Sequence, residues 1–115
     1  MAEVSKQEIE HFLVNQYRLW SEDRIDEMMD LFRRIAPNGF TIQYVGSPEV
    51  EGEKAMADMI AQYAGKMRTE LVKLLVNGNE AATVVDNIPT DSDQVIQSIE
   101  TYKFEGGKMQ VRYFH

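Results

Sequence analysis

The sequence predicts an α+β domain, a cone-shaped roll in which N-terminal helices pack on the concave face of a curved antiparallel sheet. Two observations indicate this class. Before Thr69 most apolar residues recur at helical spacing, whereas from Thr69 onward they follow the alternation that is typical of strands. Helices that come first and meandering strands that follow favour helices packed on one face of an antiparallel sheet.

Two helices in tandem are expected to open the chain. Ser5 and Glu8 have the capping-box spacing, in which a hydroxyl and a carboxylate satisfy free backbone donors at a helix start. The polar run 21–23 is expected to cap the second helix, and Pro37 with Gly39 to end it. The apolar faces are Ile9, Phe12, Leu13, Tyr17 and Trp20 in the first helix and Ile25, Met28, Met29, Leu31, Phe32 and Ile35 in the second.

A third helix and five strands are expected after this pair. The run 40–45 is rich in β-branched and aromatic residues, which favour a short strand. Gly52 leads into the third helix, and Gly65 is placed to cap its end. The other strands are predicted at about 69–76, 81–88, 94–104 and 108–115, with hairpin turns at 77–79 and 105–107 and a polar loop at 89–93.

Length and composition limit the possible functions. A chain of 115 residues supports one core, so we expect a single domain over 1–115. A net charge of −7 disfavours nucleic acid as a partner, because phosphates are bound by clustered cations. The chain has no cysteine and two histidines without a carboxylate at ligand spacing, so neither a metal nor another cofactor is expected. No apolar run approaches a membrane span and residues 1–5 lack a secretory pattern, which predicts a cytoplasmic protein with no membrane partner.

The order of elements resembles the nuclear transport factor 2-like superfamily. The runs that carry the resemblance are Gly-Glu-Lys-Ala-Met at 52–56, which opens the third helix, and Phe-Glu-Gly-Gly-Lys-Met at 104–109, which joins the last two strands. This superfamily includes the SnoaL-like polyketide cyclases, ketosteroid isomerase and limonene epoxide hydrolase. The resemblance covers essentially the whole chain and implies a cystatin-like cone with a pocket. It also implies a homodimer through the outer sheet face, where Val95, Ile99, Val111 and Tyr113 would otherwise expose apolar area.

The resemblance to the isomerases points to one acid. The run 99–104 is similar to the strand in which the isomerases carry a pocket carboxylic acid, and it places Glu100 at that position. Tyr44 falls where the isomerases keep the aspartate that shuttles the proton, and a phenol cannot serve as that base at neutral pH. Tyr17 lies one residue away from the position of the oxyanion tyrosine. Steroid isomerisation is therefore not expected.

The resemblance to the epoxide hydrolases is confined to a single position. Those enzymes hold a water with an aspartate, arginine and aspartate relay. Asp86 matches one carboxylate, but Val84 stands where the arginine should be and Phe114 stands near the other acid. One matching member of three gives this activity little support.

The partner of Glu100 depends on the turn between the last two strands. A three-residue loop at 105–107 would place Glu100 opposite Arg112, whereas a two-residue turn would place it opposite Tyr113. We expect the first register, because an enclosed carboxylate needs a partner and because the resemblance puts Arg112 and Phe114 on the concave face. Beside Arg112, Glu100 would stay ionised; beside Tyr113 in an apolar cavity, its pKa would rise and favour a neutral donor.

These residues predict a pocket protein that binds a small, largely apolar molecule. If it is an enzyme, it would isomerise, cyclise or hydrate that molecule by acid-base chemistry without a cofactor. The alternative is a non-catalytic interaction domain whose pocket is packed core, and a cavity that reaches the acid would distinguish the two. The candidate catalytic residues are Glu100, Tyr17 and Arg112, and the candidate ligand-binding residues are Trp20, Tyr44, Met59, Tyr102 and Phe114.

Overall fold

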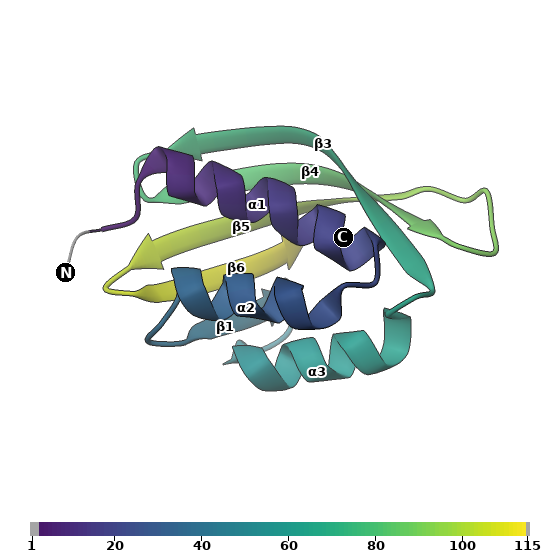
Figure 1. The fold of residues 1–115 in the computed structure, drawn as a ribbon, viewed down its shortest axis with the longest axis horizontal. Coiled ribbons are helices and arrows are strands. Elements are labelled where there is room, and N and C mark those ends of the chain that lie inside the picture. Colours follow the sequence, from purple (N-terminus) through teal and green to yellow (C-terminus); the bar gives the residue numbers. More distant parts are fainter. Residues whose placement is uncertain (1–2, 115) are drawn as a thin grey trace.

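The computed structural model of the chain describes residues 3–114. Helices and strands follow one another in the predicted order, with one additional short strand (Figure 1). None of the helices in residues 3–114 is long and apolar enough to cross a membrane. The elements are α1 (Lys6–Ser21), α2 (Ile25–Ile35), β1 (Phe40–Tyr44), β2 (Val50–Glu51), α3 (Gly52–Tyr63), β3 (Met67–Asn77), β4 (Glu80–Pro89), β5 (Ile96–Glu105) and β6 (Lys108–Phe114).

All the strands belong to one curved sheet. Their order is β2-β1-β6-β5-β4-β3, so the last four strands form an antiparallel meander and β1 joins its far edge. The β1–β6 pair is parallel, whereas the other pairs are antiparallel. The predicted α+β class is confirmed, with a mixed sheet in place of a purely antiparallel one. The strand β2 was not predicted, because two exposed residues show no alternation.

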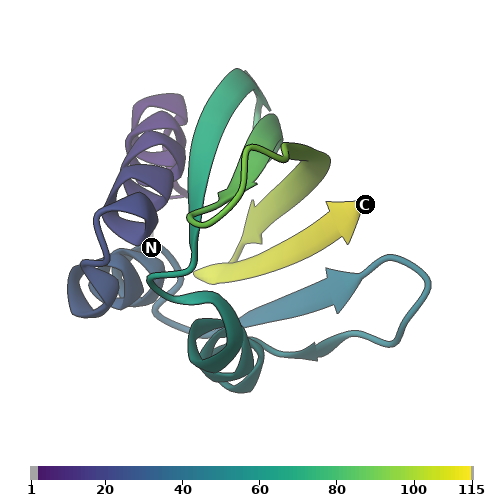
Figure 2. The same ribbon diagram turned by 90° about the vertical axis from the view of Figure 1, so that its right-hand side faces the viewer.

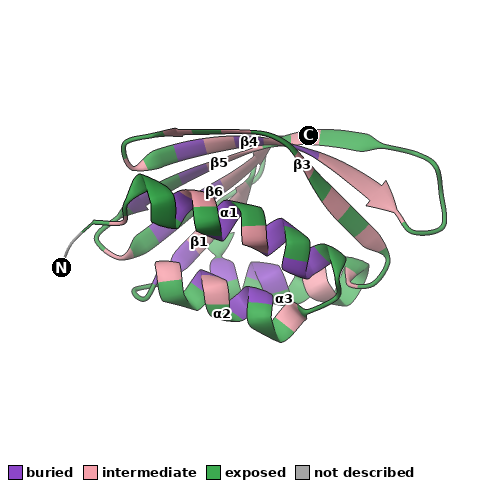
Figure 3. Cartoon of the chain, turned by 45° about the horizontal axis from the view of Figure 1, so that its top comes forward, coloured by how far each residue is buried: buried purple, intermediate pink, exposed green. Residues whose placement is uncertain are grey.

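The helices lie on the concave side of the sheet. Figure 2 shows α1 and α2 along one side of the curved strands and α3 below β1. The predicted apolar stripe of α1 is buried, and Figure 3 shows the buried positions of the helices turned toward the strands. Phe12 of α1 meets Phe32 of α2 edge to face, with ring centroids 5.0 Å apart, and also contacts Tyr102 and Phe104 of β5. Each such ring stabilises the fold by about 1.5–3 kcal/mol through burial.

The helix starts agree with the sequence in one case and differ in the other. At α1 the capping box is present: the Glu8 amide donates to the Ser5 hydroxyl at 3.1 Å, and the Glu8 carboxylate accepts from the Ser5 amide. The predicted cap of α2 at 21–23 is wrong, because Arg24 is the N-cap and makes no side-chain cap bond. The Ser21 hydroxyl instead bonds the backbone of Thr69, accepting from its amide at 2.8 Å and donating to its carbonyl at 3.0 Å. The end of α1 is therefore tied to the start of β3.

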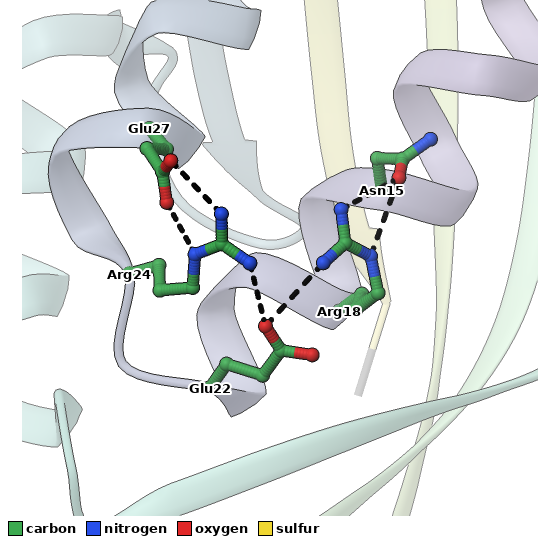
Figure 4. Close-up of polar contacts among 5 residues, drawn as sticks. All are labelled: Asn15, Arg18, Glu22, Arg24 and Glu27. Atoms are coloured by element: carbon green, nitrogen blue, oxygen red, sulfur yellow. Dashed lines mark hydrogen bonds and ion pairs between the residues drawn. The ribbon is translucent and has the colours of Figure 1, made fainter.

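A chain of charged side chains covers the outside of the α1–α2 corner (Figure 4). Arg24 lies between two carboxylates, Glu22 at 2.9 Å and Glu27, and Arg18 also reaches Glu22 at 3.3 Å. The side chains are 45–55% exposed. Exposed pairs of this kind contribute about 0–1 kcal/mol each. These ion pairs therefore add little to the corner, which backbone hydrogen bonds such as Arg24 N–H to the Leu19 carbonyl at 2.9 Å also hold.

The last hairpin has the register that we did not prefer. Glu105 pairs with Lys108, so only Gly106 and Gly107 form the turn, and Glu100 lies opposite Tyr113. Both glycines have positive φ, 61° and 73°. A two-residue turn with positive φ at both positions matches the right-handed twist of the strands, and glycine adopts it without strain.

This register reverses the two faces of β6 relative to the prediction. Arg112 pairs with Thr101 rather than Glu100, lies on the outer face and donates to the Gln43 amide oxygen at 3.1 Å. Its guanidinium also lies 5.2 Å from the ring centroid of Phe114, so both residues are absent from the concave face. Val111 is fully buried and Tyr113 points inward, so the prediction that both lie on the outer face is wrong.

The outer face still carries exposed apolar side chains. Ile99 of β5 is 47% exposed and Leu75 of β3 is 57% exposed, with β4 between the two strands. Val95, just before β5, is 53% exposed. Exposed apolar groups on a sheet face favour association. The homodimer through this face stays a prediction.

The start of α3 offers a test of the packing between helix and sheet. A Cβ at Gly52 would lie 2.2 Å from the ring of Phe40 and 2.6 Å from its carbonyl oxygen. Gly52→Ala should therefore lower the free energy of unfolding by about 1–3 kcal/mol or more, as overpacking does. Urea unfolding measures the change, and Lys54→Ala on the exposed side of the same helix is the control. Equal stability of the two variants would contradict this close approach.

Candidate functional site

A pocket opens between the helices and the concave face of the sheet. Its volume is about 290 Å³, and α1, α2, α3 and five of the strands contribute to its lining. Tyr44 and Tyr63 are 37% and 43% exposed, so the pocket is partly open to solvent. Four methionines make up much of the apolar wall: Met28, Met56, Met59 and Met67.

Glu100 supplies the charge of this pocket. It is the one acidic or basic residue among the described residues that line it. β5 carries the side chain inward, with Ile96, Ser98 and Glu100 facing the pocket at alternate positions and Tyr102 following behind them. The strand period therefore places a carboxyl in a wall that is otherwise aromatic, apolar or neutral.

Two phenols hold one oxygen of this carboxyl. Tyr17 of α1 donates its O–H to Glu100 Oε1 at 2.6 Å, and Tyr102 donates to the same oxygen in a short hydrogen bond. The phenols are supported in turn: Thr83, 1% exposed, lies 2.8 Å from the Tyr17 oxygen, and the Gln16 amide donates to the Tyr102 oxygen at 3.0 Å. Since each phenol has one proton, and both protons go to Glu100, the Thr83 hydroxyl is the donor to Tyr17.

The second oxygen of Glu100 faces the pocket. Every hydrogen bond of this side chain to another described residue ends on Oε1, which leaves Oε2 without a partner among residues 3–114. No buried side-chain oxygen or nitrogen in residues 3–114 is unsatisfied, so Oε2 reaches the pocket surface. A proton taken up by this carboxyl would therefore sit on Oε2, because Oε1 already accepts two O–H bonds.

Burial controls the acidity of this group. Removal from water raises the pKa of the Glu100 carboxyl above its ordinary value, while the O–H bonds from Tyr102 and Tyr17 lower it in part. Burial and the nearby carboxylate also raise the pKa of Tyr17 and Tyr102 well above the ordinary range, so both phenols keep their protons. The carboxyl can thus change its protonation state while its supporting donors do not.

Tyr113 is a second polar group at the same place. It lies directly opposite Glu100 in the β5–β6 pair and lines the pocket. Burial, followed by the charge of Glu100, raises the pKa of Tyr113 well above its ordinary value, so its phenol is neutral. Its hydroxyl forms no hydrogen bond to another residue in 3–114, although its ring packs on Tyr44 at 5.3 Å between centroids.

A neutral polar strip lies further along the concave face. The Asn87 amide donates to Ser98 Oγ at 2.9 Å and to the Ile96 carbonyl at 3.0 Å, and its oxygen accepts from the Thr69 hydroxyl at 3.1 Å. Both N–H groups of Asn87 are therefore used within the protein. The Ser98 hydroxyl accepts one of them and keeps its own proton for another acceptor.

The predicted site residues separate into three groups. Glu100, Tyr17, Trp20, Tyr44 and Met59 line the pocket together. Tyr102 is 2% exposed and contacts Glu100 from behind rather than lining the pocket. Arg112 and Phe114 lie on the outer face, because the two-residue turn pairs Glu100 with Tyr113 and turns the neighbouring positions of β6 outward.

Several pocket residues were missed by sequence reasoning. Tyr113 would have followed from the two-glycine turn, and Asn87 lies on the inward face of β4, a strand that was predicted without assigning its two faces. Asp86, the one match to the epoxide hydrolase relay, bonds Gln97 at 2.9 Å and lies on the opposite face of β4 from Asn87. In residues 3–114 no three His, Cys, Asp or Glu side chains gather where they could hold a metal ion.

Comparison with protein families identifies the family of this chain. The family model of the SnoaL-like domain matches residues 13–111, which is most of the chain. The chain therefore belongs to the SnoaL-like domain family, and the predicted resemblance is confirmed. No curated protein matches it by sequence.

Solved structures share the fold at low sequence identity. A de novo designed protein with a curved β-sheet has a TM-score of 0.75 at 15% identity, with 96% of this chain and 87% of that chain covered. A proposed SnoaL-like polyketide cyclase from Jannaschia sp. CCS1 has a TM-score of 0.65 at 18% identity, with 99% and 90% covered. An LEH-like epoxide hydrolase from M. tuberculosis has a TM-score of 0.65 at 12% identity, with 94% and 82% covered. Identities this low establish a common fold.

The raised pKa of Glu100 predicts how stability depends on pH. Because the folded-state pKa lies above the unfolded value of about 4.3, the folded protein binds the proton more tightly, and stability falls as pH rises through that window. Glu100→Gln removes this loss while its amide oxygen can still accept both phenol bonds. The free energy of unfolding of the variant minus that of the parent should therefore increase as pH increases.

Urea unfolding at a series of pH values between about 4 and 8 measures this difference. Glu105→Gln, at the exposed end of the same strand, reports the general effect of removing one negative charge. A Glu100→Gln difference that is constant with pH, or that shrinks as pH rises, would contradict the burial of this carboxyl.

Proposed function

We propose that this protein binds a small, largely apolar molecule in the pocket and that Glu100 meets its polar group and exchanges a proton with it. One observation carries the proposal: a carboxyl in an apolar wall has one oxygen fixed by two phenols and the other directed into the cavity. A general acid or base needs a proton site that is fixed in space and open to the ligand. Glu100 Oε2 is such a site.

The walls support a ligand that is mainly apolar. Aromatic and methionine side chains surround the carboxyl, and methionine adapts its shape to irregular ligands. A volume of about 290 Å³ is at the small end of ligand pockets, which favours a molecule of one or two rings. The alternative of a packed, non-catalytic core would require side chains to fill this space, so the cavity that reaches Glu100 favours ligand binding.

The chemistry of the site supports proton transfer as the reaction step. Isomerisation, cyclisation and hydration each need a proton moved at a defined atom, and burial raises the pKa of the Glu100 carboxyl, which makes it a better proton donor site than an ordinary, fully ionised glutamate. The proposed polyketide cyclase and the epoxide hydrolase of the same fold carry names of these reaction classes. Tyr17 and Tyr102 position the carboxyl, and Arg112 has no part in the step because it lies on the other face.

Trp20 provides a direct test, because it is the one tryptophan of the sequence and it lines the pocket. Titration with one-ring probes such as 2-phenylethanol should change its fluorescence in a saturable way. Ser98→Phe places a ring in the cavity and should weaken binding about tenfold or more. Gln97→Phe, one residue earlier on the opposite face of β5, is the matched control and should bind as the parent does.

Circular dichroism and thermal unfolding establish that both variants are folded. If neutral, cationic and anionic probes all fail to bind at millimolar concentration, the proposed function is wrong. Binding that Ser98→Phe leaves unchanged would place the ligand elsewhere and would contradict it equally.

A further inference from the structure

The pocket contains an acid without a counter-charge. Of the described lining residues, Glu100 alone is ionisable as an acid in the neutral range, and none is Lys, Arg or His. The cation that we expected to balance it, Arg112, lies on the outer face and bonds Gln43. A buried carboxylate with no cation is costly, so either a proton or a cationic ligand is needed to balance it.

The hydrogen bonds around Glu100 are arranged for the ionised form. Two donor chains converge on Oε1: Thr83 donates to Tyr17, which donates to Glu100, and Gln16 donates to Tyr102, which donates to the same oxygen. Hydrogen bonds donated to a carboxylate stabilise the anion relative to the neutral acid. The protein thus contributes donors to the anion and leaves the balancing positive charge to come from outside.

A second acceptor lines the same cavity as Glu100. Tyr113 is cross-strand to Glu100, and its phenol oxygen has no hydrogen-bond partner in residues 3–114. Directly opposed strand residues have Cβ atoms about 4.5–5.5 Å apart, and both side chains line the same cavity, where the charge of Glu100 acts on the Tyr113 phenol. An ammonium has three donors and can bond the carboxylate and the phenol oxygen at once.

The rest of the wall also suits a cation. Trp20, Tyr44 and Tyr63 line the same cavity as the Tyr113 ring, and aromatic faces attract ammonium groups. Among the described residues, Tyr63, Glu100 and Asp58 raise the pKa of Tyr44 through their charge, after the larger effect of burial. The chain as a whole carries −7, so the field around the pocket favours positive ligands.

We infer that the pocket selects a small apolar amine, bound as its ammonium ion between Glu100 Oε2 and the phenol oxygen of Tyr113, with the aromatic rings around it. This inference rests on the proposed function and names the class of ligand for the same site. It assigns Tyr113 as a ligand-positioning residue.

Matched probes separate this inference from the proposed function. Calorimetry at pH 7.5 with 2-phenylethylamine, 2-phenylethanol and 3-phenylpropanoate compares a cation, a neutral molecule and an anion that share one ring. The amine should bind about tenfold or more tighter than the alcohol, because hydrogen bonds to charged groups are the stronger ones. The anion should bind weakest, because it meets a like charge.

Variants assign the preference to named atoms. Glu100→Gln should remove the preference for the amine, so that amine and alcohol bind about equally, whereas Glu105→Gln should leave the ratio of the two affinities as it is in the parent. Tyr113→Phe should weaken the amine by about threefold to tenfold, the effect of one hydrogen bond, without loss of the preference for a cation. Thermal unfolding of each variant shows that it is folded.

The pH dependence gives a readout that a structural role would not produce. The groups that face Glu100 are the phenols of Tyr17 from α1, Tyr44 from β1, Tyr102 from β5 and Tyr113 from β6, with uncharged Thr83 from β4. These phenols stay neutral below pH 8, and an alkyl amine stays protonated there, as lysine does with a pKa of about 10.4. Amine affinity should therefore fall as pH is lowered through the pKa of Glu100, and alcohol affinity should change little.

Three results would overturn the inference. If the alcohol or 3-phenylpropanoate binds as tightly as the amine, or if affinity for the amine rises at low pH, the pocket does not select a cation, although the proposed binding function would stand. If the preference for the amine persists in Glu100→Gln, the ammonium does not pair with Glu100. If no probe binds, the proposed function itself is wrong.

Discussion

The convergence of two phenol O–H groups on one oxygen of Glu100 is the interaction on which the site depends. Tyr17 comes from the first helix and Tyr102 from the fifth strand, so this contact ties the helical layer to the concave face of the sheet at the pocket. A buried carboxyl would otherwise cost several kcal/mol, a large part of the stability of a small domain. The phenols reduce that cost and direct the second oxygen of the carboxyl into the cavity.

Other features of the fold serve to hold this geometry. The bonds between Ser21 and the Thr69 backbone fix the end of α1 on β3, and the Phe12–Phe32 contact holds α2 against α1. The helices and the concave face of the sheet then enclose a cavity beside Glu100, and methionines form part of its wall. A SnoaL-like scaffold thus places one acid where a ligand can reach it while the surrounding donors remain protected from water.

Much of the fold could be predicted from the sequence, because the apolar spacing of α1 and the alternation of the meander are strong local patterns. The strand β2 could not, since two residues show no period. The cap of α2 was predicted wrongly because the Ser21 hydroxyl found a backbone partner 48 residues away, which no local pattern indicates. Glu100 lines the pocket, which is where the resemblance of the run 99–104 to the isomerase strand led us to expect it.

The partner of Glu100 was predicted wrongly because hydrogen-bond donors, and not only a cation, can stabilise a buried carboxylate. We assumed that a buried carboxylate requires a partner, and the family resemblance put Arg112 on the concave face, so we chose the hairpin register that supplied Arg112. The consecutive glycines at 106 and 107 favoured the other register, because both can adopt positive φ. Hydrogen-bond donors from Tyr17 and Tyr102, which come from different elements, replaced the cation, and their convergence depends on tertiary packing that a sequence pattern does not show.

The most direct test is a titration of the Glu100 carboxyl itself, followed by its side-chain carbon resonance in ¹³C-labelled protein. If the carboxyl is buried and held by the two phenols, its pKa lies above the ordinary glutamate value and rises further in Tyr17→Phe, which removes one donor to the anion. An ordinary pKa that Tyr17→Phe does not change would mean that the side chain lies in solvent and that the pocket has no acid.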